Sequence, residues 1–325
     1  MRACGQVHRR HAAKQDWCRQ SRFRPTRMTE MAATPGSGGA PRRNQSGPAR
    51  ATASGIARDR MRELNRLAVE IGWQAAVEQI VPEEAAGICD ERGPGFLYVW
   101  DLPPNSTVLE IGDGWGASVA LGRAFARVIA VENAVERARF IDLRARQMNL
   151  PVHAICADFL SLPLAREQFD AIALNGILDR LPAVADDPWE AQLRFLRSIR
   201  ESLKPSGFVC ASVRNRHGWD RLSGQPRSAG ENDGAYVRSL PGYRKLFHEA
   251  GYGAVRAFHV WNGSMDTALL LPLDNPKALR YFVDLCNFAG FGWRGRIKET
   301  TLRAAARTGL WARCAPDVVF QVEKG

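Results

Sequence analysis

The sequence predicts an α/β fold in which helices cover both faces of a parallel sheet. Two observations carry this prediction: apolar strand candidates alternate with helical patterns, and a glycine-rich turn joins the first strand to the helix after it. The strand candidates are Val108–Ile111, Val128–Val131, Val152–Ala157, Phe169–Leu174 and Phe208–Val213. The helical patterns between them are Ala117–Ala126, Ala134–Met148 and Trp189–Leu203. Such alternation is typical of a doubly wound sheet, because parallel neighbours need crossover helices.

The segments on either side of this alternation have different patterns. Apolar residues at helical spacing predict a helical segment over 58–100, ahead of a core over 101–261 that ends with a strand at Ala254–Val260. The residues 262–325 form the last segment, in which an aromatic, helical stretch precedes the apolar run "DVVFQV". We expect an insertion or lid there, followed by a closing strand.

Most of the net charge of +11 comes from the first 60 residues. They hold 13 of the 45 Lys and Arg but only 3 of the 34 Asp and Glu, so the rest of the chain is almost neutral. Residues 1–57 also lack apolar periodicity, and we expect a disordered basic tail. Such a tail could bind polyanions nonspecifically, target the protein to an organelle, or precede the real start of translation. We favour a tail with no specific role or a mis-assigned start. The near-neutral remainder argues against nucleic acid as a partner.

The distribution of apolar residues and cysteines bears on the compartment. No run of about 18 apolar residues occurs, so no transmembrane helix is expected. The basic N-terminus lacks the apolar segment of a secretory signal. The 7 cysteines are scattered without a C-x-x-C pair, which favours small core residues over metal or redox sites. We therefore expect a cytoplasmic protein without a bound metal; the sequence says nothing of its oligomeric state.

The stretch "TVLEIGDGWGAS" (107–118) holds three glycines at alternate positions, Gly112, Gly114 and Gly116. Glycines between a strand and a helix allow positive φ and let backbone N–H groups approach a ligand closely. The spacing also satisfies the dinucleotide fingerprint, so the turn alone leaves a nicotinamide dinucleotide and S-adenosylmethionine open as cofactors. A role in helix–strand packing alone is the plainer alternative.

Three carboxylates accompany this turn. Glu132 ends the next strand about 20 residues later, where a carboxylate can accept both hydroxyls of a ribose. Asp158 follows the third strand and suits an adenine amino group. Glu110 precedes the first glycine, where a buried carboxylate could orient an amino group through water.

With these residues considered together, the chain resembles a class I S-adenosylmethionine-dependent methyltransferase. The matching stretches are "VLEIGDGWG" (108–116), "VIAVE" (128–132), "ADFLSLPLAREQFDAIALNGIL" (157–178) and "FLRSIRESLKPSGFV" (195–209). The resemblance implies a Rossmann-like, doubly wound sheet of seven strands with an antiparallel last strand, plus a helical insertion near the C-terminus. It also implies S-adenosylmethionine as the cofactor.

The resemblance further implies a role for each residue of the cofactor site. The residues around the methionine moiety would be Glu110, Gly112, Asp113, Gly114 and Gly116. Glu132 would bind the ribose, Asp158 would lie near the adenine, and Phe159 would pack on its ring. Asn175, after the fourth strand, would face the sulfonium and the substrate.

Three of these roles have a plainer alternative. Glu132 could be a carboxylate stabilised by the dipole of the following helix. Asp158 could be a turn residue, and Phe159 could belong to the core.

The catalytic candidates are Asn175, Asp179 and His217. Many relatives carry a Glu-His pair after the fourth strand, whereas this chain has "LDRLP", which removes an obvious histidine base. Asp179 could serve as a base, but a surface carboxylate is an equal alternative. His217 follows the fifth strand in "VRNRHGW", at the edge where open α/β sheets bind ligands, and could also be a solvent-facing loop residue.

The methyl acceptor is the least determined part of the prediction. The fourth strand ends in "ALNGI" without the proline and aromatic residue of an N-P-P-Y motif, which argues against methylation of nucleic-acid bases. A loose similarity to methyltransferases of sugar and surface-polysaccharide pathways favours a hydroxyl of a small molecule or saccharide. The alternatives are a noncatalytic Rossmann-like binding protein and an NAD-dependent oxidoreductase.

Overall fold

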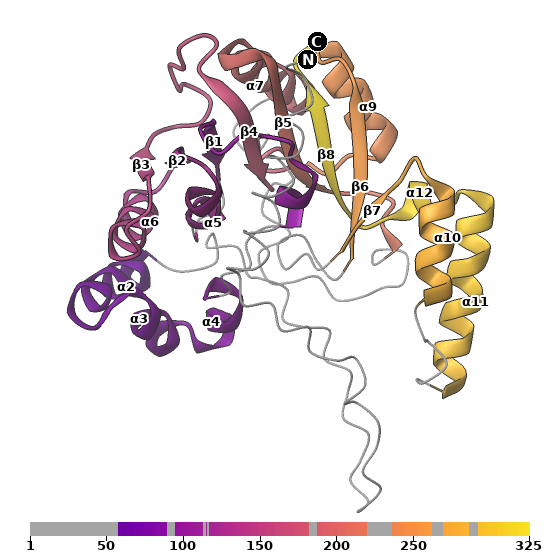
Figure 1. Cartoon of the computed structure of the whole chain (residues 1–325), viewed down its shortest axis with the longest axis horizontal. Helices are drawn as coiled ribbons and strands as arrows, with labels where there is room; N and C mark the ends of the chain where they lie inside the picture. Colours follow the sequence, from indigo (N-terminus) through magenta and orange to yellow (C-terminus); the bar gives the residue numbers. More distant parts are fainter. Residues whose placement is uncertain are drawn as a thin grey trace, which may run out of the picture. The chain divides into compact units, whose positions relative to one another are not determined.

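A computed structural model describes residues 58–89, 95–112, 115, 117–181, 187–219, 236–261, 269–285 and 292–325 (Figure 1). The chain divides into the units Met1–Gln45 and Ser46–Gly325, and all the described residues belong to the second. The predicted basic tail at 1–57 lies outside the described residues. Within them, no helix has both the length and the apolar character needed to cross a membrane.

The described residues form an eight-stranded sheet in the order β3-β2-β1-β4-β5-β8-β6-β7. Its strands are β1 (Thr107–Ile111), β2 (Arg127–Glu132), β3 (Val152–Cys156), β4 (Phe169–Asn175), β5 (Leu203–Arg214), β6 (Val255–Trp261), β7 (Leu269–Pro272) and β8 (Asp317–Glu323). Strands β1 to β5 pair in parallel, and β8 runs antiparallel between β5 and β6. The Rossmann-like α/β prediction and its antiparallel last strand are confirmed.

The sheet differs from the prediction by one additional strand. The apolar run "TALLLPL" supplies β7, which pairs antiparallel with β6 at the edge of the sheet. The chain then forms α10 (Pro276–Leu285), α11 (Gly292–Thr308) and α12 (Trp311–Cys314) before it returns to the sheet as β8. The predicted C-terminal insertion therefore contributes a strand as well as helices.

Successive side chains of the central strands point to opposite faces of the sheet, and apolar side chains are buried on both faces. Along β4, Ile172 and Leu174 belong to one core cluster, whereas Ala171 and Ala173 belong to another. The first cluster includes side chains of α7 (Pro188–Ser202) and α9 (Leu240–Glu249). The second includes side chains of α5 (Ala117–Ala124), α6 (Val135–Gln147) and the 3-10 helix η2 (Gly95–Val99). This two-sided burial explains why the strands are continuous apolar runs.

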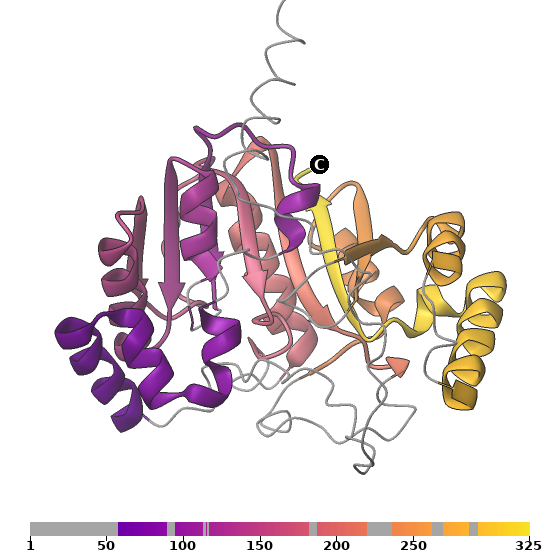
Figure 2. The same cartoon turned by 60° about the horizontal axis from the view of Figure 1, so that its bottom comes forward.

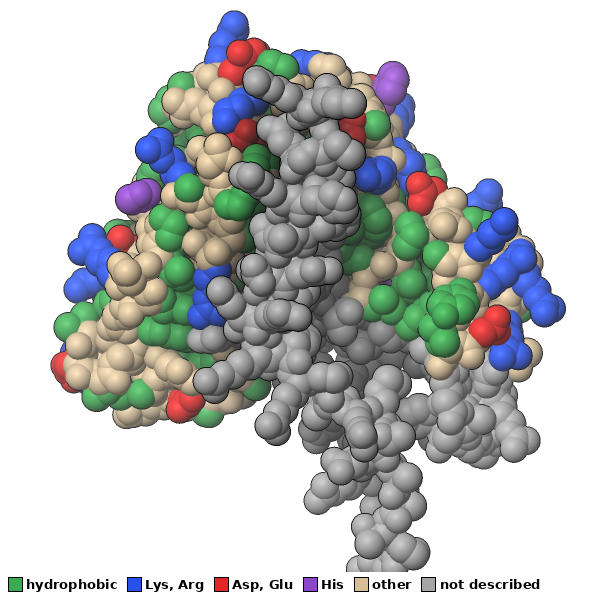
Figure 3. Space-filling view, viewed as in Figure 1, with side chains coloured by type: hydrophobic (Ala, Val, Ile, Leu, Met, Phe, Trp, Pro, Cys, Tyr) green, Lys and Arg blue, Asp and Glu red, His purple; other side chains and the backbone are tan. Residues whose placement is uncertain are grey.

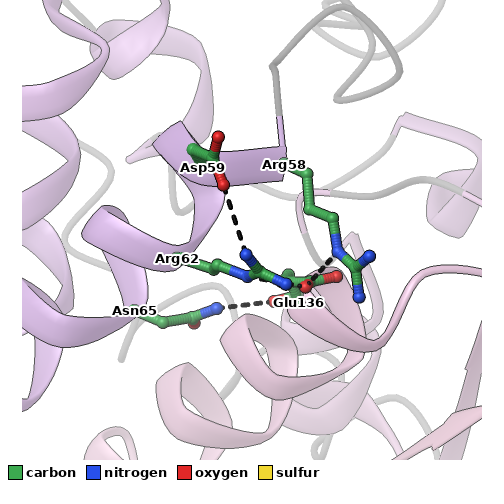
Figure 4. A network of polar contacts seen from close by, with 5 residues as sticks. All are labelled: Arg58, Asp59, Arg62, Asn65 and Glu136. Carbon is green, nitrogen blue, oxygen red and sulfur yellow. Dashed lines mark hydrogen bonds and ion pairs between the residues drawn. The ribbon is translucent and has the colours of Figure 1, made fainter.

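The N-terminal helical segment packs against α6. It consists of α2 (Arg58–Ile71), α3 (Trp73–Ile80) and α4 (Pro82–Ile88), whose buried apolar residues share a cluster with Phe140 of α6. A polar network centres on Glu136, whose carboxylate accepts hydrogen bonds from Arg58 and Arg62 and whose carbonyl accepts one from Asn65 (Figure 4). Because exposed ion pairs contribute little, the apolar cluster supplies most of the stabilisation.

The two helical additions lie at opposite ends of the sheet. Helices α2 and α3 lie beside α6, near the β3 edge, with α4 packed against α3, and α10 and α11 lie beyond β7 (Figures 1 and 2). A small apolar core joins α10, α11 and α12 to β7. On the face drawn in Figure 3, Lys and Arg side chains are spread among acidic and apolar ones rather than gathered into one patch.

His259 of β6 makes the stability of the fold depend on pH. Its imidazole is buried, its Nδ1 lies 3.1 Å from the carbonyl oxygen of Asp317, and its ring packs edge-on against Trp311. Burial lowers the pKa of His259 from 6.5 to about 4. The unfolded chain therefore takes up a proton below about pH 6.5 that the folded chain refuses until about pH 4, so stability falls as the pH drops through this window.

We expect the wild-type protein to lose about 2 kcal/mol of unfolding free energy from His259 between about pH 7.5 and pH 5. A His259→Gln variant lacks this component and should show a correspondingly weaker pH dependence. Urea unfolding of both proteins at the two pH values measures the difference. Equal pH dependences would show that the imidazole does not remain neutral in the fold.

Candidate cofactor site

The carboxyl ends of β1, β2 and β4 meet at one edge of the sheet. Ile111 is in register with Val131 of β2 and with Leu174 of β4, so the residues that follow these three strands lie side by side. The backbone N–H of Gly112 donates to the carbonyl of Val131 at 3.2 Å, which fixes the start of the glycine turn against β2. This edge is where open α/β sheets bind ligands.

Gly112 has a conformation and surroundings that only glycine fits. Its φ is +81°, and a Cβ built on it would lie 3.1 Å from Cβ and Cδ1 of Ile177. A side chain at this position would therefore be strained and would also press on the turn after β4. Asp113, Gly114 and Gly116, which are also predicted to contact the cofactor, lie outside the described residues.

Glu110 and Asn175 form a buried polar pair at this edge. Asn175 Nδ2 donates to Glu110 Oε1 at 2.8 Å, and the two residues are 1% and 7% exposed. In the described part of the chain, the Oδ1 atom of Asn175 is buried without a hydrogen-bond partner. Because a buried acceptor without a partner is costly, this atom is suited to a donor supplied by a ligand.

Glu132 is the last residue of β2 and is 2% exposed. Its backbone carbonyl accepts from the N–H of Ala157 at 2.9 Å, which ties the ends of β2 and β3 together. The cap residue of α6 is Ala134, so Glu132 lies outside the first turn of that helix. Since the effect of the helix dipole falls off beyond the terminal turn, its position favours a role toward a ligand.

Asp158 and Phe159 lie where their plainer interpretations would place them. The carboxylate of Asp158 accepts from the N–H of Leu160 at 3.2 Å and from Ser161 Oγ at 2.9 Å, which is the arrangement of a turn. Phe159 is buried within the cluster that lies between the sheet and helices α7 and α9. Their proposed contacts with an adenine ring stay predictions.

Asp179 is a buried residue, and the alternative that it is a surface carboxylate is wrong. It is 2% exposed because the turn after β4 folds under α9 and the end of β5. Its Oδ1 accepts from the hydroxyl of Tyr243, and its Oδ2 accepts from the backbone N–H of Arg214 at 3.1 Å. Burial raises the pKa of Asp179, while these hydrogen bonds and the charge of Arg214 lower it. The carboxylate therefore joins three elements of the fold.

His217 is exposed just beyond the end of β5. The backbone N–H of His217 donates to Asn215 Oδ1 at 3.1 Å. Asn215 Nδ2 in turn donates to the backbone carbonyls of Arg313 and Ala315 at 2.7 and 2.9 Å. The loop that carries His217 is thus anchored to the segment before β8. This anchor keeps the imidazole at the carboxyl edge, although no hydrogen bond within the described residues brings it to Asn175 or Asp179.

Arg144 is a structural residue of the site that the sequence reasoning missed. It is 4% exposed, and its guanidinium donates to the carbonyls of Trp115 and Ile88, each at 2.9 Å. The guanidinium also lies 4.1 Å from the centre of the Trp73 ring. Because Trp115 belongs to the glycine-rich turn, Arg144 connects that turn to the N-terminal helices. An arginine on an otherwise apolar helix face was the available signal.

The strand order is that of a Rossmann-like α/β fold, and the comparison with known families identifies the class of enzyme. The chain carries a class I S-adenosylmethionine-dependent methyltransferase domain, and S-adenosylmethionine is its cofactor. Residues 108–207 match the family described as "Methyltransferase domain". The predicted enzyme class and cofactor are confirmed.

Similar proteins include several kinds of S-adenosylmethionine enzyme. A carboxy-S-adenosyl-L-methionine synthase from Geobacter sp. (strain M21) is 25% identical over 189 residues, which cover 49% of this chain and 74% of that protein. A methyltransferase from Thermotoga maritima has a TM-score of 0.46 at 17% identity, over 82% of this chain and 100% of that chain. Geranyl diphosphate C-methyltransferase from Streptomyces coelicolor A3(2) has a TM-score of 0.44 at 16% identity, over 78% and 85% of the two chains.

Proposed function

We propose that the protein transfers the methyl group of S-adenosylmethionine to a hydroxyl of a small molecule or saccharide. In this proposal Glu110, Gly112 and Asn175 hold the methionine end of the donor, and Glu132 binds its ribose. The observation that carries it is the Glu110–Asn175 pair, which leaves a buried acceptor, Asn175 Oδ1, at the carboxyl edge of the sheet. An amino group or another donor of the bound cofactor would satisfy that oxygen.

The residues of this edge suit a reaction that depends on alignment. Methyl transfer is an in-line displacement at the sulfonium methyl, and holding the two reactants in line removes much of its barrier. The hydroxyl of the acceptor must lose its proton during the reaction, which calls for a base. His217 is the candidate for this role, because Asp179 accepts hydrogen bonds from Tyr243 and Arg214 in the interior.

Incubation of the protein with methyl-labelled S-adenosylmethionine and fractionated cell extract tests the acceptor class. We expect label in the small-molecule or saccharide fraction, in a linkage that survives mild alkali as a methyl ether does. An excess of S-adenosylhomocysteine should suppress this labelling and serves as the control. Label confined to protein, lipid or RNA, or released by mild alkali as a methyl ester would be, contradicts the proposal.

A further inference from the structure

Arg180 brings a guanidinium to the carboxyl end of β4. It lies in the turn that follows this strand, where its backbone N–H donates to the carbonyl of Ile177 at 2.9 Å. The side chain turns back over Gly176, since a Cβ built on that glycine would lie 4.0 Å from Arg180 Nη2. Gly176 directly follows Asn175, so the guanidinium lies next to the proposed methionine end of the cofactor site.

The charges around Arg180 come from the carboxyl ends of β2, β4 and β5 and from the start of α6. The positive charges of Arg214, at the end of β5, and of Arg137, in the first turns of α6, oppose that of Arg180. The negative charges of Asp179 and Glu132 favour it. Burial is the largest of these effects and lowers the pKa of Arg180. The guanidinium is therefore half-buried among two other arginines and two carboxylates.

Both carboxylates already have other roles. Asp179 accepts from Tyr243 and from the backbone of Arg214, and Glu132 is the residue proposed to bind the ribose. Within the described ranges, the guanidinium of Arg180 makes no hydrogen bond and no ion pair at 4.0 Å or less. A half-buried cation that only neutralised these carboxylates would be expected to contact one of them.

A guanidinium in this position is well matched to an oxyanion. Its planar set of N–H donors binds a carboxylate or a phosphate through two parallel hydrogen bonds. The partly desolvated surroundings strengthen such a contact, and an anion would offset the repulsion from Arg137 and Arg214. The anion would also lie near the sulfonium of the donor and would reduce the net positive charge there.

We propose that Arg180 binds an oxyanion of the methyl acceptor, a phosphate or a carboxylate group, beside the carboxyl end of β4. This inference rests on the proposed function and narrows its substrate class to anionic small molecules, among them phosphorylated or acidic saccharides. Arg180 is then a specificity-determining residue, because an acceptor without the anion would leave the guanidinium without a partner.

Calorimetric titration of inorganic phosphate, and separately of acetate, into the protein saturated with S-adenosylhomocysteine tests this site. The wild-type chain should bind at least one of the two probes, and Arg180→Gln should bind it at least tenfold more weakly. Arg180→Lys keeps the charge without the planar donor set and should have an intermediate affinity. Arg194→Gln, at an exposed position of α7, should bind as the wild type does.

The affinity for S-adenosylhomocysteine separates this inference from the proposed function. We expect Arg180→Gln to bind S-adenosylhomocysteine within about twofold of the wild type, and melting curves to show that it is folded. Stronger binding of phosphate than of acetate assigns a phosphorylated acceptor, and the reverse assigns a carboxylate. Undiminished anion binding by Arg180→Gln, or no anion binding by the wild type, overturns the inference. Failure of the wild type to bind S-adenosylhomocysteine would instead overturn the proposed function.

Discussion

Replacement of Glu132 by glutamine is expected to weaken the binding of S-adenosylhomocysteine by about 1–3 kcal/mol, or about 5- to 150-fold. The carboxylate lies at the end of β2, and we propose that it accepts both hydroxyls of the ribose. Glutamine has nearly the same shape but only one acceptor oxygen and no charge. The melting temperature without ligand should change little, because the substitution preserves the packing of a residue that is 2% exposed. Titration calorimetry and thermal melting provide the two measurements.

Glu136→Gln is the matched control for this experiment. Glu136 follows Glu132 closely in the sequence and lies in the first turn of α6. Its carboxylate faces α2 and pairs with Arg58 and Arg62 (Figure 4). This variant should keep the wild-type affinity for S-adenosylhomocysteine, with a small loss of stability. If Glu132→Gln also kept the wild-type affinity, the ribose contact would belong to another residue.

The Asp179→Ala variant is expected to lose about 3–5 kcal/mol of unfolding free energy, the cost of breaking a buried charged contact. The alanine leaves the hydroxyl of Tyr243 and the backbone N–H of Arg214 without their acceptor. Asp179→Asn retains the shape and one acceptor oxygen, so its loss should be smaller. Denaturant unfolding of the three proteins at neutral pH gives the free energies.

The Asn variant also separates a structural role from a catalytic one. If Asp179 connects the turn after β4 to β5 and α9, methyl transfer by Asp179→Asn should decline only as far as its stability does. A variant that is as stable as the wild type and binds S-adenosylhomocysteine normally, yet transfers no methyl group, would identify Asp179 as the base. Phe195→Leu, a substitution in the same core cluster on α7, whose side chain makes no hydrogen bond to Asp179, controls for a general loss of stability.

The parts of the fold that depend on local pattern could be predicted from the sequence. Strands β2, β4 and β5 contain uninterrupted apolar runs, because both of their faces are buried, and turns or helices separate the strands from one another. Strand β7 has only four residues, and its apolar run has no alternation that distinguishes strand from helix. The place of β8 between β5 and β6 is a property of the whole topology, which the resemblance implied only in part.

In the candidate site, too, some features could be predicted from the sequence and others could not. The place of Glu110, Glu132 and Asn175 at the carboxyl edge could be predicted, because a strand end fixes the position of its residues relative to neighbouring strands. Their contacts with the cofactor stay predictions. The burial of Asp179 and the contacts of Arg144 could not be predicted, because their partners are distant in sequence: Tyr243 is 64 residues from Asp179, and Ile88 is 56 residues from Arg144. Helical periodicity places Arg144 on the apolar face of α6, but it does not identify the distant partners that decide whether such a residue is buried.

The most direct test of the account is a calorimetric titration of the wild-type protein with S-adenosylhomocysteine and, in parallel, with NAD. We expect saturable binding of one S-adenosylhomocysteine per chain and no saturable binding of NAD. Absence of S-adenosylhomocysteine binding, or saturable binding of NAD in its place, would contradict the assignment of this sheet edge to the methyl donor.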